Sequence, residues 1–121
     1  MKFDDLLEVP YKAHGRTKEE GFDCYGLVIE CCRRAGTPLA DLDYSVSSLP
    51  DCEAAKYAKR MNVRQIPCAR PGALVEMNCE GALHLGYMID RNNVLHMTRR
   101  GCKLSCLAAC KVSAFYEVTK K

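Results

Sequence analysis

The segment Gly21-Phe22-Asp23-Cys24-Tyr25-Gly26-Leu27-Val28 joins a polar capping residue to a run of apolar residues with helical spacing. Asp is among the preferred residues at a helix N-cap, because its carboxylate accepts the free backbone N–H groups of the first turn. Apolar residues then recur at i, i+3, i+4 and i+7, and Gly36 supplies a stop signal. The sequence therefore predicts a helix over 24–35 with Cys24 as its first residue.

A cysteine at the first position of a helix has a chemical advantage over one elsewhere. The helix N-terminus carries about half a positive charge, which favours the thiolate, the nucleophilic form of cysteine. This position indicates a nucleophilic role for Cys24. Taken alone, the segment fits equally well a buried structural cysteine in a cysteine-rich chain.

A thiol nucleophile needs a base, and the imidazole of that base needs a group that orients it. The chain offers His14, His84 and His96. His84 lies in a predicted strand over 82–89 and His96 in a second over 94–98, so we expect His84 to be the base and His96 the orienter. The alternatives are a core histidine bonded to a backbone carbonyl for His84 and a solvent-facing one for His96. His14 lies in a loop, and we assign it no role.

The separation of His84 and His96 constrains the hairpin between them. They are twelve residues apart (96 minus 84), so they can lie directly opposite each other only if the hairpin is symmetric about Asp90 and its connection holds an odd number of residues or a bulge. A two-residue turn at 91–92 would place His84 opposite Arg99 and turn His96 to the other face. The catalytic interpretation predicts the first arrangement.

Four blocks, in order along residues 10–97, resemble the NlpC family of papain-like cell-wall cysteine peptidases. Asp23-Cys24-Tyr25-Gly26-Leu27-Val28 resembles the family's Asp-Cys-Ser-Gly-Leu-Val signature. Residues 10–11 resemble the family's upstream Pro-Tyr, and residues 71–75 resemble its Pro-Gly-Asp-Leu-Val strand. Residues 84–97 resemble its His-Val-Gly-Ile-Tyr hairpin, which ends in Ile-His. Tyr25 replaces the family's Ser and Ala73 its Asp. An aromatic residue after the cysteine, in a chain without a signal, resembles the branch found in phage tails and prophages.

The resemblance implies a cysteine peptidase that hydrolyses peptidoglycan stem peptides through a thioester acyl-enzyme. By analogy, the bond joins the γ-D-glutamyl residue to the diamino acid. Cys24, His84 and His96 would be catalytic. Tyr11 is expected to line the oxyanion region together with the backbone N–H of Cys24, and Tyr25 to shape the substrate pocket. Two alternatives remain open: a catalytically silent phage tail or interaction module, and an amidase or acyltransferase on the same fold.

The order of the predicted elements gives the fold class. We expect one domain over 1–121, in the α+β class, with the nucleophile helix packed on a curled antiparallel sheet. Besides the elements named above, we expect a helix over 51–61, a connector over 63–72 and strands over 73–77 and 112–118. Residues 102–110 fit either a loop or a short helix. Gly26, one turn from Cys24, suggests close packing against another backbone.

Composition narrows the partners. The net charge of +3 is mild and its basic residues are scattered, so neither nucleic acid nor a membrane is expected as a partner. The first residues lack the apolar core of a signal peptide. We therefore expect cytoplasmic synthesis, action at the bacterial wall, and phage tail proteins as candidate partners that carry the enzyme there.

The nine cysteines are the other unusual feature of the composition. An odd number in a chain without a signal argues against a disulfide framework. The spacing of Cys102, Cys106 and Cys110 is not that of zinc ligands, so we expect no metal and no cofactor. We interpret these thiols as small buried hydrophobic groups in a reducing cytosol.

Overall fold

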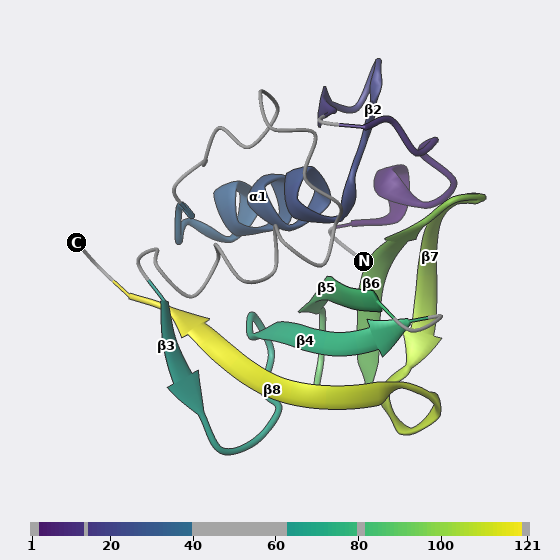
Figure 1. Cartoon of the computed structure of the whole chain (residues 1–121). Helices are drawn as coiled ribbons and strands as arrows, with labels where there is room; N and C mark the ends of the chain where they lie inside the picture. The colour runs from purple at the N-terminus through teal and green to yellow at the C-terminus, as the bar shows by residue number, and fades with distance from the viewer. Residues whose placement is uncertain (1–2, 14, 40–62, 80–81, 120–121) are drawn as a thin grey trace.

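The fold of this protein is known from a computed structural model that describes residues 3–13, 15–39, 63–79 and 82–119. One α-helix packs on an antiparallel sheet, as expected for the α+β class (Figure 1). The elements, in chain order, are η1 (Asp4–Leu6), β1 (Arg16–Thr17), β2 (Gly21–Phe22), α1 (Cys24–Ala35), β3 (Val63–Ile66), β4 (Leu74–Cys79), β5 (Ala82–Met88), β6 (Asn93–Thr98), β7 (Gly101–Cys106), η3 (Leu107–Ala109) and β8 (Lys111–Val118). The helix expected over 51–61 lies outside the described residues.

Helix α1 begins and ends where the sequence predicts. The side chain of Asp23 accepts a hydrogen bond from the backbone N–H of Gly26 at 2.7 Å, which is the expected N-cap. Gly36 ends the helix in the left-handed conformation, with φ of 79°. Because both signals act within one turn of the helix, they could be recognised in the sequence without knowledge of the rest of the fold.

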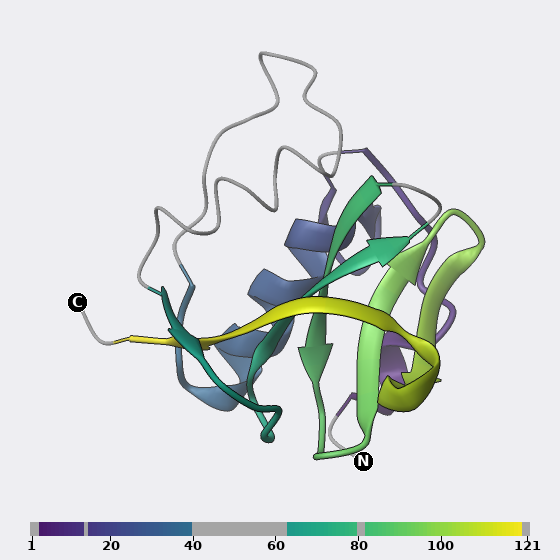
Figure 2. The same cartoon turned by 60° about the horizontal axis from the view of Figure 1, so that its bottom comes forward.

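The larger sheet has six strands in the order β3-β8-β4-β5-β6-β7, and it curls around without closing (Figure 2). Each pair of neighbours is antiparallel. Side chains alternate between the two faces of each strand. One face packs against α1 and contributes Leu74, Leu85, Tyr87, Leu95 and Met97 to the main core. The opposite, concave face holds a second cluster formed by Ala73, Val75, Met77, Met88 and Val94.

Two segments differ from the expected secondary structure. Residues 63–66, expected to be part of a connector, form edge strand β3, because they pair with β8. Residues 101–106 form β7, neither loop nor helix, because a tight turn at 99–100 folds them back along β6. In that turn Thr98 Oγ1 accepts from the N–H of Arg100 and donates to the carbonyl of Gly101. Pairing with a distant strand, which local spacing does not reveal, decides both segments.

The hairpin between β5 and β6 has neither of the two registers considered from the sequence. His96 pairs with Gly86, so the hairpin is symmetric about Arg91 and its connection is the three residues 90–92. Asp90 Oδ1 accepts the backbone N–H groups of Asn92 and Asn93, which makes Asp90 the start of the turn and not its centre. The connection is odd in length, as expected, but His84 and His96 are not directly opposite each other.

The described cysteines differ in burial, and Cys110 is half-buried. The seven that the structure describes are all free thiols. Cys24, Cys31, Cys32 and Cys102 are buried, as the interpretation of small hydrophobic groups requires. Cys68 and Cys106 are exposed, so for these two that interpretation is wrong. Burial raises the pKa of Cys32 and of Cys102 to about 12, and it raises the pKa of Cys31 as well.

Candidate active site

Cys24 occupies the first turn of α1 and is fully buried. It belongs to the core cluster that also contains Leu85, the neighbour of His84, and Leu95 and Met97, which flank His96. Helix α1 and strand β5 run in roughly the same direction, so their starting residues lie at the same end of the molecule (Figures 1 and 2). Cys24 therefore lies near the end of the sheet that carries the two histidines, although His84 and His96 point to the face opposite the one that packs on α1. Contact between its sulfur and the ring of His84 remains a prediction.

The segment before Cys24 is held by a partly buried ion pair. Asp23 is 1% exposed, and its Oδ1 lies 3.0 Å from Nη1 of Arg16. The same guanidinium donates to the carbonyl of Gly15 and stacks over the ring of Tyr25, 5.6 Å from its centre. An ion-paired carboxylate that also caps the helix fixes the position of Cys24. Arg16 was not singled out in the sequence, because nothing local connects it to Asp23.

Gly26 packs against a neighbouring backbone, as suggested by its position in the sequence. A Cβ at this position would collide with the carbonyl oxygen of Gly15 and would lie 3.0 Å from Nη1 of Arg16. The first turn of α1 therefore packs directly against the loop that carries Arg16.

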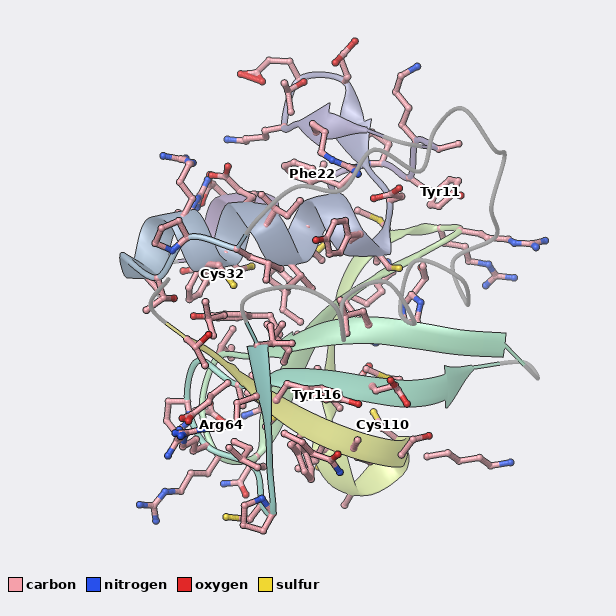
Figure 3. All side chains as sticks on the ribbon, turned by 60° about the vertical axis from the view of Figure 1, so that its left-hand side comes forward. Tyr11, Phe22, Cys32, Arg64, Cys110 and Tyr116 are labelled. Atoms are coloured by element: carbon pink, nitrogen blue, oxygen red, sulfur yellow. The ribbon has the colours of Figure 1, made fainter. Side chains whose placement is uncertain are left out.

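The two tyrosines proposed to meet the substrate are in different environments. Residues 10–12 run beside β2: Phe22 donates to the carbonyl of Pro10, and Lys12 donates to the carbonyl of Phe22. This places Tyr11, which is 39% exposed, on the side of the N-terminal end of α1 (Figure 3). Tyr25 is 1% exposed. The substrate roles of both residues remain predictions.

The two histidines contact each other on the concave face of the sheet. Nδ1 of His96 lies 3.4 Å from Nε2 of His84, and the ring planes are nearly perpendicular at 82°. The recorded pairing of β5 with β6 stops at Gly86 and His96, so His84 lies past its last pair. There the ring of His84 also forms a hydrogen bond with the backbone of Met97. At this end of the hairpin, the side chain of His84 links β5 to β6 through its contacts with His96 and Met97.

Burial keeps both imidazoles neutral near pH 7. His84 is 7% exposed and His96 8%. Desolvation lowers the pKa of His84 to about 4; the nearby His96 lowers it further, and the bond to Met97 opposes the change. Burial also lowers the pKa of His96. A neutral imidazole has one donor nitrogen and one acceptor nitrogen, as a proton-accepting base requires.

A third polar group completes this set of contacts. Oγ of Ser105, on β7, lies 2.8 Å from Nε2 of His96. Ser105 was not among the residues expected at the site, because residues 102–110 were expected to form a loop or a short helix. Once β7 is recognised as a strand whose Lys103 pairs with His96, alternation places Ser105 on the same face as His96.

Other features of the described residues do not extend this site. They contain no group of three or more His, Cys, Asp or Glu side chains that could hold a metal ion. Among them, no helix is long and apolar enough to cross a membrane. An open cavity of about 560 Å³ lies at the far end of α1, where Ala35, Gly72 and Tyr87 are among its lining residues. Because neither Cys24 nor the histidines line it, this cavity is separate from the candidate active site.

A helix that starts at a capped cysteine, packed on an antiparallel sheet that carries two contacting histidines, has the arrangement of a papain-like fold. A comparison with protein families matches residues 8–117 to the NlpC/P60 family, and the chain belongs to that family. The family indicates cell-wall peptidase or hydrolase activity toward peptidoglycan peptides. A comparison with individually curated proteins found no match.

Proposed function

We propose that this protein is a cysteine peptidase that cleaves peptidoglycan stem peptides between the γ-D-glutamyl residue and the diamino acid. The observation that carries the proposal is the contact between His84 and His96, and the capped start of α1 supplies Cys24 as the nucleophile. In this contact His84 is a neutral base whose ring is oriented by the ring of His96. The family match supports the substrate class.

The proposed reaction has two halves. The Cys24 thiol gives its proton to Nδ1 of His84, and the sulfur attacks the carbonyl carbon of the γ-glutamyl amide. The carbonyl oxygen becomes an oxyanion, which the backbone N–H of Cys24 and the hydroxyl of Tyr11 would stabilise, since a helix N-terminus presents free N–H groups. The C–N bond then breaks, the proton on His84 passes to the leaving amine, and a thioester remains.

Water completes the turnover. His84 removes a proton from the water, whose oxygen attacks the thioester carbon. The C–S bond then breaks, the proton on His84 passes to the departing sulfur, and the γ-carboxylate and the Cys24 thiol are released. His96 takes no proton in this scheme. It holds the ring of His84 by the contact to Nε2.

The test is digestion of defined muropeptides, with the products identified by mass in heavy-oxygen water. We expect cleavage at the γ-glutamyl bond, one heavy oxygen in the new carboxylate, no effect of EDTA and no product with Cys24→Ala. Transfer of the acyl group to an added amine would indicate an acyltransferase. Binding without any product from the wild-type chain would indicate a silent module and would overturn the proposal.

The proposal includes a setting for the enzyme. Tyr25 directly after the nucleophile is the feature that resembles the phage-associated branch of the family. We propose that phage tail proteins carry the enzyme to the wall, and recovery of the chain from purified tails is the measurement that tests this part.

A further inference from the structure

Three side chains from three strands form a continuous line of polar contacts. Nε2 of His84 on β5 lies 3.4 Å from Nδ1 of His96 on β6, and Nε2 of His96 lies 2.8 Å from Oγ of Ser105 on β7. Both nitrogens of His96 are therefore engaged, one toward each neighbouring strand. A hydroxyl can donate or accept, so the direction of the bond to Ser105 decides where the proton of His96 is placed.

Two arrangements of protons satisfy both of these contacts while both imidazoles are neutral. If Ser105 donates to Nε2 of His96, then Nδ1 of His96 carries the proton and donates to Nε2 of His84. The proton of His84 must then sit on its Nδ1, which cannot accept a proton from a thiol. If Ser105 accepts from Nε2 of His96, then Nδ1 of His96 accepts from Nε2 of His84, and Nδ1 of His84 is left as a base.

We propose that Ser105 is a positioning residue that accepts the Nε2 proton of His96 and thereby keeps Nδ1 of His84 able to accept the proton of Cys24. This inference rests on the proposed function, since it names a group that holds the tautomer of the same site. Ser105 acts through His96 and His84, and it does not touch the substrate.

The burial of His96 explains why a protein hydroxyl is needed there. A solvent-exposed ring would find water for either tautomer, whereas His96 is 8% exposed and depends on fixed partners. The pairing of His96 with Lys103 holds β7 in register, so Ser105 stays within reach of the ring. The wrong tautomer of a catalytic histidine can cost several orders of magnitude in rate, on the order of 10⁴ in a serine peptidase.

The experiment compares Ser105→Ala with Ser105→Thr, which keeps the hydroxyl, and with Leu104→Ala as a control, because Leu104 is exposed and lies on the opposite face of the same strand. Nitrogen-labelled histidine reports by NMR which ring nitrogen carries the proton. In the wild type we expect Nε2–H on both His96 and His84. In Ser105→Ala we expect a mixture of tautomers and a loss of kcat of about tenfold or more, with KM nearly unchanged. Thr should restore both, and Leu104→Ala should change neither.

The tautomer spectra separate this inference from the proposed function. An Nδ1–H proton on His96 in the wild type, or the same Nε2–H population in Ser105→Ala as in the wild type, would overturn the role of Ser105 even if muropeptides are cleaved. If the wild type cleaves nothing, the proposed function fails, yet the spectra still decide the role of Ser105. Circular dichroism checks that Ser105→Ala is folded, and the wild-type spectrum alone tests the tautomer if it is not.

Discussion

Nδ1 of His96 lies 3.4 Å from Nε2 of His84, although the residue paired with His96 on β5 is Gly86. The two rings are diagonal neighbours on one face, separated by one pair of residues along the hairpin. Gly86 allows this contact, because a Cβ there would lie 3.3 Å from Cβ of His96, 2.7 Å from Cγ2 of Val94 and 2.8 Å from Cε of Met77. Because Gly86 has no side chain, Val94 and Met77 can pack beside the ring of His96 without a steric clash.

Replacing Gly86 should show how closely the histidine pair depends on that space. Gly86→Ala forces a methyl group against Val94, which costs about 1–3 kcal/mol of the free energy of unfolding, and it displaces the ring of His96. Urea unfolding and kcat measure the two effects. Val94→Ala in the same chain should recover most of the lost stability. Gly36→Ala is the control, because nothing lies within 4 Å of its Cβ and only its φ of 79° is unfavourable.

Cys24 should remain the thiol most readily alkylated as the pH falls. It lies at a helix N-terminus, which favours the thiolate, whereas labelling of an ordinary thiol decreases about tenfold for each pH unit below 8. Peptide mapping after brief iodoacetamide treatment at about pH 6 should find Cys24 labelled before Cys68 and Cys106. These two exposed thiols of the same chain serve as the reference for an ordinary cysteine. Faster labelling of either exposed thiol would remove the case for an activated Cys24.

Loss of the thiol should affect turnover and not the fold. Cys24→Ala removes the nucleophile, so we expect no turnover above the uncatalysed background and a small change in stability. Cys102→Ala serves as the matched control, because it removes a buried thiol outside the proposed chemistry. It should lower the free energy of unfolding by about 1 kcal/mol and leave kcat almost unchanged. An active Cys24→Ala enzyme would contradict the assignment of the nucleophile.

His96 should act through the orientation of His84. His96→Asn retains a side chain that can accept a hydrogen bond from His84, whereas His96→Ala retains none. We expect His96→Asn to keep measurable kcat, and His96→Ala to lose about 10²-fold or more with a smaller change in KM. Equal activity of the two variants would show that the contact between the rings does not orient the base.

The buried His84 should make the fold sensitive to acid. Its pKa is lowered from 6.5 to about 4 in the folded state, so between these values the unfolded chain binds a proton that the folded chain does not. Stability therefore falls as the pH decreases through this window, by about 3 kcal/mol in total for this group. Urea unfolding of Cys24→Ala at about pH 7 and about pH 4.5 measures the loss without interference from the thiol. His84→Gln in the same background should reduce the pH dependence by most of that amount; an unchanged pH dependence would rule out His84 as its source.

The sequence by itself determined the parts of this protein that depend on neighbours along the chain. The bounds of α1 follow from Asp23 and Gly36, because each makes its capping interaction within one turn of the helix. The strands expected over 73–77, 82–89, 94–98 and 112–118 correspond to β4, β5, β6 and β8. The spacing of the Cys24 and His84 motifs indicated the NlpC family that the comparison shows.

Only the tertiary structure decided how the strands meet. The register of β5 and β6 depends on the turn that Asp90 forms and on the space at Gly86, and neither is visible in the alternation of side chains. Strand β7 forms because it pairs with β6, and that pairing brings Ser105 to His96. Hydrogen bonds between strands join residues whose separation along the chain is set by the whole fold. Local spacing could therefore identify the histidines, whereas the group that holds His96 was found only once the strands were paired.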